Sequence, residues 1–290
     1  MNVRAVERQS IEVALRRALE RQEFTLHFQP KVDLRSGSIT GAEALIRWTH
    51  PVRGSIPPAQ FIPIAEDCGM IVRIGNWVVR KACEQAREWV NAGLPVATMA
   101  VNVSALEFWN EGFLPGLFGI LDETGLDPRS LEIELTESVL MKRTESAASI
   151  LRMLRERGIR IAVDDFGTGY SSLSYLRKFP IDALKIDQSF VGQTSGAGDD
   201  AAIVTAVIGM ARSLKLRTVA EGVESQAQLT FLQAHQCDEA QGYHFSPPVP
   251  ATAFAKLLEY GIPGFKGAPR LRAGSEAGQP AALGEMEFEA

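Results

Sequence analysis

The chain alternates between short apolar runs and longer segments in which apolar residues recur every three or four positions. Short runs rich in β-branched residues predict strands, and the longer periodic segments predict helices. Strands are predicted over residues 24–32, 41–48, 98–104, 131–136, 159–164, 181–186, 217–221 and 238–242. Helices are predicted over residues 71–92, 105–124, 144–157, 172–179, 199–215, 225–234 and 251–260.

The connections between these segments predict how the strands pair. Only the short stretch DLRSGSIT separates the first two strands, which is too little for a crossover helix, so this pair should be antiparallel. The remaining strands alternate with helices, as in repeated β-α units. We therefore expect an α/β fold, a (β/α)₈ barrel of the TIM type with one irregular strand. An open doubly wound sheet is the alternative.

The two ends of the chain differ from this pattern. Residues 1–22 predict a charged helix that leads in or links to an upstream domain, and residues 23–263 form the predicted barrel. Residues 264–290 are rich in Gly, Ala, Pro and Glu, so we expect a disordered tail. No run of 18 apolar residues occurs, and we expect a cytoplasmic protein whose barrel makes no membrane contact.

Composition narrows the candidate functions. The net charge of −5 argues against a general binder of nucleic-acid polymers or of membrane surfaces, which would carry a basic excess. An anionic substrate would therefore need local groups or metal ions to attract it. Three cysteines lack CxxC spacing and are expected to be small core residues in a reducing compartment. The four histidines show no metal-ligand spacing.

Polar residues interrupt or end every predicted strand from the second to the eighth. They are Glu43, Asn102, Glu134, Asp164 with Asp165, Lys185 with Asp187, Glu221 and Gln241. A single carboxylate after a strand is more often a helix N-cap or a turn residue than a functional group. Seven successive strands with such residues favour a shared site, because catalytic groups of barrel enzymes come from the ends of several strands.

The neighbours Asp164 and Asp165 raise a separate question. Adjacent side chains point to opposite faces within a strand, but where a strand ends in a loop they can converge. Two like charges placed together are costly unless something positive lies between them. An oxygen-rich set suits Mg²⁺ or Mn²⁺, and a bridging carboxylate can hold two cations about 3.5–4 Å apart, as in phosphoester hydrolysis. The candidate ligands are Glu43, Asn102, Glu134, Asp164 and Asp165.

Several motifs in the same order resemble one known family. AEALIRWTHP (residues 42–51) looks like the signature of EAL domains, the bacterial cyclic-di-GMP phosphodiesterases, and further motifs continue the resemblance from Phe24 to Tyr260. These further motifs are FIPIAEDCGMI, VNVS, ELTES, DDFGTGYSSLSYL, LKIDQSFV, VAEGVE and QGYHFS. Two departures from the family pattern, Ile46 and Pro247, do not touch the chemistry.

The resemblance implies a barrel whose first strand is antiparallel, and it implies a role for each matching residue. The implied metal ligands are Glu43, Asn102, Glu134 and Asp164, with Asp165 at a second metal. Lys185 matches a lysine that contacts the catalytic water, and Glu221 matches a proposed base or water-mediated metal contact. The implied substrate-binding residues are Arg47, Asp187, Glu224 and Gln241. Glu137 matches a glutamate that steadies the loop 165–172.

The function that this resemblance implies is hydrolysis of cyclic-di-GMP to linear 5′-pGpG. It implies Mg²⁺ or Mn²⁺, two per active site, with Ca²⁺ inhibitory because its looser coordination misplaces the water. It also implies a homodimer and an upstream sensory or GGDEF domain. Two alternatives stay open: a catalytically silent cyclic-di-GMP receptor, and metal-assisted proton abstraction with Lys185 as base. The complete carboxylate set disfavours the first, and the paired aspartates disfavour the second.

Overall fold

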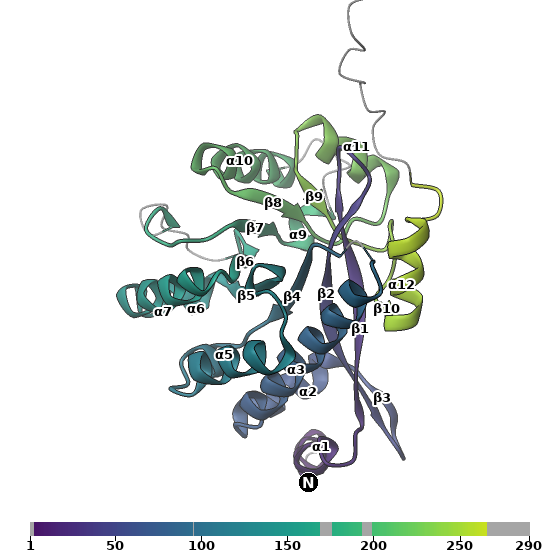
Figure 1. Cartoon of the computed structure of the whole chain (residues 1–290), viewed down its shortest axis with the longest axis vertical. Helices are drawn as coiled ribbons and strands as arrows, with labels where there is room; N and C mark the ends of the chain where they lie inside the picture. Colours follow the sequence, from purple (N-terminus) through teal and green to yellow (C-terminus); the bar gives the residue numbers. More distant parts are fainter. Residues whose placement is uncertain (1–2, 95, 169–175, 193–198, 266–290) are drawn as a thin grey trace, which may run out of the picture.

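Strands form a closed barrel surrounded by helices in the computed structural model, which describes residues 3–94, 96–168, 176–192 and 199–265 (Figure 1). The strands are β1 (Phe24–Asp33), β2 (Ile39–His50), β3 (Gly54–Ile56), β4 (Thr98–Asn102), β5 (Leu131–Thr136), β6 (Arg160–Phe166), β7 (Ala183–Ile186), β8 (Arg217–Ala220), β9 (Glu239–Ala240) and β10 (Val249–Pro250).

The helices lie outside the strands in space, and all those described except α1 and α12 lie between strands in sequence (Figure 1). They are α1 (Val3–Ala18), α2 (Pro58–Asp67), α3 (Ile71–Asn91), α4 (Ala105–Phe108), α5 (Phe113–Thr124), α6 (Glu137–Met141), α7 (Thr144–Arg157), α9 (Gln188–Val191), α10 (Asp199–Leu214), α11 (Gln226–Ala234) and α12 (Ala251–Tyr260), with a 3₁₀ turn at Pro128–Ser130.

Strand pairing closes the barrel through β1. The order around it is β1-β2-β4-β5-β6-β7-β8-β9, and β9 pairs with β1 again. β1 is antiparallel to both of its barrel neighbours, whereas the pairs from β2 to β9 are parallel. β3 and β10 add short antiparallel pairings to β2 and β1. The predicted barrel with an antiparallel first strand is confirmed, and the open doubly wound sheet is excluded.

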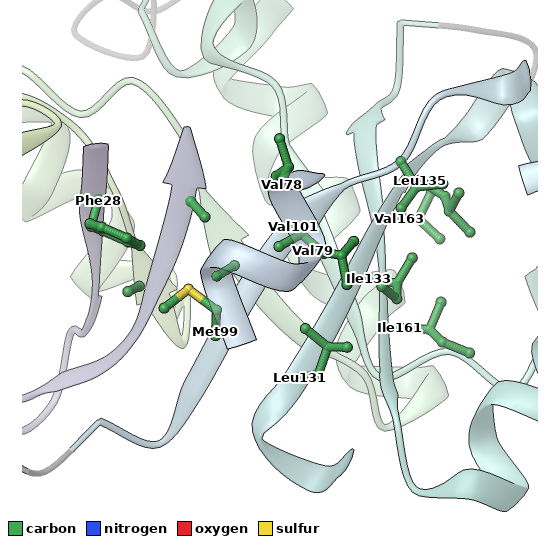
Figure 2. Close-up of a cluster of buried hydrophobic side chains, with 14 of the residues drawn as sticks. Phe28, Val78, Val79, Met99, Val101, Leu131, Ile133, Leu135, Ile161 and Val163 are labelled. Carbon is green, nitrogen blue, oxygen red and sulfur yellow. The ribbon is translucent and has the colours of Figure 1, made fainter. Parts of the chain in front are cut away.

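The hydrophobic core lies between the barrel wall and the helices. Strand side chains alternate between the two faces of the wall, so every second residue of a strand points outward. In β4, β5 and β6 the outward residues are apolar and fully buried, and they pack together with residues of α3 (Figure 2). Those labelled in Figure 2 from these strands are Met99, Val101, Leu131, Ile133, Leu135, Ile161 and Val163.

Helix α3 shows why such segments fold onto the wall. Its buried residues recur at the three- and four-residue spacing of one helix face, from Ile71 and Ile74 to Val78 and Trp89. Burying each large apolar side chain contributes about 1.5–3 kcal/mol. This apolar face therefore holds α3 against the strands.

The amino-terminal helix joins this core. Ile11, Leu15 and Ala18 of α1 are at most 1% exposed, and α1 packs against α2. Within the described ranges, no helix is both long and apolar enough to cross a bilayer. The tail expected to be disordered lies outside the described residues from position 266 onward.

Several local predictions differ from the structure. The single helix predicted over 105–124 is wrong, because it is divided into α4 and α5 by a turn in which Asn110 accepts a hydrogen bond from the Gly112 N–H at 2.8 Å. α2, α6, α9, β3 and β10 were not predicted. α2 carried a usable signal, since Pro58 at its first position precedes apolar residues at helical spacing. Most of the helix predicted over 172–179 lies outside the described residues.

Candidate active site

Charged side chains, rather than branched apolar ones, line much of the barrel interior. The inward positions of β5 are Glu132 and Glu134, each 1% exposed. Each has an alanine as its partner on one side: Ala100 lies beside Glu132, and Ala162 lies beside Glu134. Ala162 itself pairs with Ala183 of β7. Small residues at these positions leave room for long charged side chains, where TIM barrels ordinarily hold packed Val, Ile and Leu.

Lys185 of β7 lies at the centre of the site. Its Nζ is 2.6 Å from Glu134 Oε2, 2.7 Å from Glu221 Oε1, 3.2 Å from Asp164 Oδ2 and 3.7 Å from Glu43 Oε2. The lysine is 1% exposed, and although burial lowers its pKa, the surrounding carboxylates raise that pKa well above the ordinary value. One fixed ammonium therefore joins acids from four strands or strand ends.

Glu43 of β2 is oriented by amides at the ends of two other strands, Asn102 in β4 and Gln241 directly after β9. Asn102 Nδ2, at the end of β4, donates to Glu43 Oε1 at 2.6 Å, and Gln241 Nε2 donates to Glu43 Oε2. The same Gln241 amide reaches Gln29 Oε1 of β1 at 2.9 Å. These bonds connect the antiparallel strand to the parallel ones across the barrel mouth.

A β-bulge brings the two aspartates together. Val163 pairs with Leu184 and Phe166 with Ile186, so β6 has one more residue than β7 between these pairs. Asp165 occupies this bulge with φ of 51°, a left-handed conformation that few residues other than glycine adopt. The bulge interrupts the alternation of faces, and the Asp165 N–H donates to Asp164 Oδ1 at 2.9 Å. The predicted convergence is therefore achieved inside the strand rather than beyond it.

Three carboxylates at this edge can share a cation. One oxygen from each of Asp164, Asp165 and Glu221 lies within 4.8 Å of the others. Burial and the charges of Asp164 and Asp187 raise the pKa of Asp165 to about 6. Burial, followed by the charges of Asp164 and Glu43, raises the pKa of Glu221 to about 8 against the opposing effect of Lys185. Raised pKa values in a crowded acidic group mean that added positive charge would be stabilised there.

The remaining predicted residues lie around this cluster. Arg47 of β2 is half-buried and lines a cavity of about 250 Å³ together with Asn102, while burial lowers its pKa. Asp187 caps α9, accepting from the Ser189 N–H at 3.0 Å, and its charge acts on Asp165. Glu224 is exposed on the loop before α11.

Glu137 begins α6 and is 4% exposed. Its Oε2 is buried without a hydrogen-bond partner among the residues that the structure describes. Its expected contact with the loop 165–172 falls partly on residues 169–172, which are outside the described residues. Within the described part of that loop, Gly167 has φ of 99°, a left-handed conformation that glycine adopts without steric cost.

A second layer of charges below the cluster was not predicted. Lys31 Nζ is 2.6 Å from both Glu132 Oε1 and Glu134 Oε1, and Arg217 bonds Glu132 at 2.7 Å and Glu239 at 2.9 Å. A signal was present in the sequence, because LEIELT alternates apolar and polar residues, and Lys31 interrupts a strand-like run.

The model of one family matches most of the chain. The EAL domain model matches residues 12–248. The chain belongs to the EAL domain family. The resemblance seen in the motifs is thereby confirmed, and the barrel described above is an EAL barrel.

Curated relatives of this EAL domain are longer proteins. The bifunctional diguanylate cyclase/cyclic di-GMP phosphodiesterase MucR of Pseudomonas aeruginosa is 45% identical over 251 residues, which are 87% of this chain and 37% of MucR. The signaling protein YkoW of Bacillus subtilis is 42% identical over 85% of this chain and 31% of its own length. The chain thus spans about a third of these relatives.

Solved EAL structures share the fold. PaMucR phosphodiesterase in complex with c-di-GMP superposes with a TM-score of 0.82 at 44% identity, covering 84% of this chain and 99% of that one. The EAL enzyme Bd1971 in its form bound to cAMP and cyclic-di-GMP gives a TM-score of 0.82 at 33% identity, covering 89% of this chain and 70% of that one.

The residues of this EAL barrel fit a hard divalent cation. The donors are carboxylate and amide oxygens, and one ammonium faces four carboxylates, which leaves an excess of negative charge. Glu134 accepts from a lysine at each oxygen, but every carboxylate oxygen has a second lone pair with which to bind an ion.

Proposed function

We propose that this EAL domain hydrolyses cyclic-di-GMP to linear 5′-pGpG in a reaction that requires divalent cations. The observation that carries the proposal is the convergence of Glu43, Glu134, Asp164 and Glu221 on Lys185 at one mouth of the barrel. The relative MucR, named for cyclic di-GMP phosphodiesterase activity, and the complex of PaMucR with c-di-GMP support this substrate.

Two cations, Mg²⁺ or Mn²⁺, are proposed for each site, because the acidic oxygens exceed what one ion would neutralise. When bound, such cations lower the pKa of a water toward neutrality and neutralise charge on the phosphoryl group. Ca²⁺ is expected to inhibit because its longer and looser coordination suits this chemistry poorly. The proposed ligands are Glu43, Asn102, Glu134, Asp164 and Asp165.

The chain's own residues would orient and stabilise the reacting groups. The Lys185 ammonium, held between Glu134 and Glu221, is placed to hydrogen-bond the attacking water or a phosphoryl oxygen, where fixed positive charge favours the transition state. Glu221 retains its proton near neutral pH until positive charge arrives, and once ionised it can accept a proton from that water.

The substrate would be held around the rim of the barrel. Arg47 remains charged despite its lowered pKa and can clamp a phosphate with its planar guanidinium. Asp187, Glu224 and Gln241 are proposed as further substrate contacts, with Gln241 acting from its position beside Glu43. Glu137, with one unpartnered oxygen among the described residues, is proposed to steady the loop that follows Asp165.

We also propose how this domain is placed in a longer protein and in the cell. Residues 23–263 would be the catalytic domain and residues 1–22 a helical lead-in to an upstream sensory or GGDEF domain, as the greater length of the curated relatives suggests. We further propose a homodimer in the cytoplasm, where the nucleotide substrate would be available.

The first experiment is incubation of the purified chain with cyclic-di-GMP and Mg²⁺ or Mn²⁺, with the products separated by chromatography. Metal-dependent pGpG that is abolished by EDTA, by Ca²⁺ and by Asp164→Asn is the expected result. Tight binding of cyclic-di-GMP without product would instead identify a receptor. If the chain neither binds cyclic-di-GMP nor yields product, the proposal is overturned.

A further inference from the structure

Lys31 of β1 connects the candidate metal ligands to a buried layer of charges beneath them. It is 1% exposed, and its Nζ lies 2.6 Å from Glu132 Oε1 and 2.6 Å from Glu134 Oε1. Of these two glutamates, only Glu134 also contacts Lys185 in the upper layer. Lys31 is thus the cation that joins the two layers in the described part of the barrel.

The lower layer holds Lys31 in place. Glu132 Oε2 accepts from Arg217 at 2.7 Å, and Arg217 also forms two bonds with Glu239 at 2.9 and 3.0 Å. The charges therefore alternate from Glu239 through Arg217 and Glu132 to Lys31. Charge-assisted hydrogen bonds in a buried network are short and strong, so the ammonium of Lys31 has little freedom to move.

We propose that Lys31 is a positioning residue for the metal-dependent reaction, acting by fixing the carboxylate of Glu134. This inference rests on the proposed function. Among the described residues, Glu134 is the carboxylate of the cluster with a lysine on each oxygen, Lys31 on Oε1 and Lys185 on Oε2. The two bonds fix both the position and the plane of the carboxylate.

Without Lys31, Glu134 would depend on Lys185 alone. That ammonium is shared with Glu221, Asp164 and Glu43, so it would no longer impose one orientation on Glu134. A ligand that must be ordered when the metal binds weakens that binding, and loss of partners that orient metal ligands typically costs about 10–100-fold in affinity or activity. The expected consequence of losing Lys31 is weaker metal binding rather than weaker contact with the nucleotide.

The test compares Lys31→Met with the double variant Lys31→Met/Glu132→Gln. The single variant leaves Glu132 with Arg217 as its remaining cationic partner. The double variant removes one positive and one negative charge together, and the amide oxygen introduced at position 132 can still accept a bond from Arg217. The double variant therefore keeps the buried charges balanced, while Glu134 still lacks the bond from Lys31. Lys81→Met is the matched control, since Lys81 pairs with Glu84 on the surface of α3.

Mn²⁺ dissociation constants are measured by electron paramagnetic resonance of the free ion, alongside thermal unfolding and turnover as a function of metal concentration. Both Lys31 variants should bind Mn²⁺ about 10-fold or more weakly than the unsubstituted chain. Their turnover should recover partly at high metal concentration with little change in KM for cyclic-di-GMP. Lys81→Met should match the unsubstituted chain in every measurement.

Two results would overturn the positioning role: a folded double variant with unchanged Mn²⁺ affinity, or a double variant that does not fold, which would make Lys31 a requirement of the fold alone. Absence of Mn²⁺ binding and turnover in the unsubstituted chain would instead count against the proposed function. The two failures are therefore distinguishable.

Discussion

At the scale of single residues, the geometry of Asp165 is the feature that gives β6 two neighbouring acids on one site. Its φ of 51° accommodates the extra residue of the bulge. This conformation destabilises most residues by roughly 1–2 kcal/mol, whereas glycine, asparagine and aspartate tolerate it. The identity of the residue therefore serves the backbone as well as the proposed chemistry.

Because Asp165 serves both the backbone and the proposed chemistry, two substitutions at this position should differ in their effect on stability. Asp165→Asn should keep the bulge and the unfolding temperature, because asparagine tolerates left-handed backbone, while losing ~100-fold or more of metal-dependent turnover. Asp165→Ala should lose the same activity and a further ~1 kcal/mol of stability. Thermal unfolding and turnover of both variants test this prediction. Full activity in Asp165→Asn would show that Asp165 is not a metal ligand.

The protonation of Glu221 predicts a pH dependence of stability in the absence of metal. Its pKa is about 8 in the folded chain and about 4.3 when unfolded, so between these values the folded state holds a proton that the unfolded state has lost. Stability contributed by this group therefore falls as pH rises from about 4.3 to 8. In EDTA, the unfolding temperature should decline over this range more steeply for the unsubstituted chain than for Glu221→Gln. Identical slopes in the two proteins would contradict the raised pKa.

At the scale of elements, a helix cap supports the loop that follows Asn102. Ser104 caps α4 and forms a capping box with Glu107, whose carboxylate accepts from the Ser104 N–H at 3.0 Å. Glu107 is 8% exposed and packs directly over Gly75 of α3. Contact between two helices thus sets the position of the β4–α4 connection beside the site.

Gly75→Ala tests this contact. The added methyl group would overlap Glu107 Oε1, so the cap or α3 must shift, at a cost of about 1–3 kcal/mol. Gly119→Ala in α5 is the matched control, because its methyl group meets no heavy atom within 4 Å among the described residues, and it should stabilise by about 0.5–1 kcal/mol. Denaturant unfolding of both variants measures the difference, and equal effects would show that the helix contact is unimportant.

At the scale of the whole molecule, an aromatic group links distant parts of the chain around the closing strand. Trp89 of α3 stacks on Phe254 of α12 with ring centroids 4.9 Å apart, and Phe28 of β1 meets the same indole at 4.9 Å. β1 closes the barrel between β2 and β9, and it also contacts α3 and α12, two helices that lie far apart in the sequence. This packing holds the barrel closed.

Trp89→Ala should therefore destabilise the entire barrel, by about 3–5 kcal/mol, because Trp89 is 3% exposed and its removal leaves a cavity among long-range contacts. Tyr260→Ala, at an aromatic residue of α12 that is 77% exposed, should change stability by less than about 0.5 kcal/mol. Chemical denaturation compares the two, and a small effect at Trp89 would mean that closure does not depend on this group.

The sequence by itself determined the class of fold and most of the candidate site. Periodicity is a local property, so the strand and helix faces, the short connection that makes β1 antiparallel, and the acids at strand ends could all be predicted from neighbouring residues. Helix α7 was predicted with its observed bounds, Thr144–Arg157.

Only the tertiary structure decided which charges meet and in what order. Lys31 lies about a hundred residues from Glu132 and Glu134 in sequence, with separations of 101 and 103, and nothing local indicates that closure of the barrel brings them within 2.6 Å. The bulge at Asp165 likewise depends on the register of β6 against β7. Both features arise from closing the sheet, because side chains inside a barrel are brought together by strand register rather than by their distance along the chain.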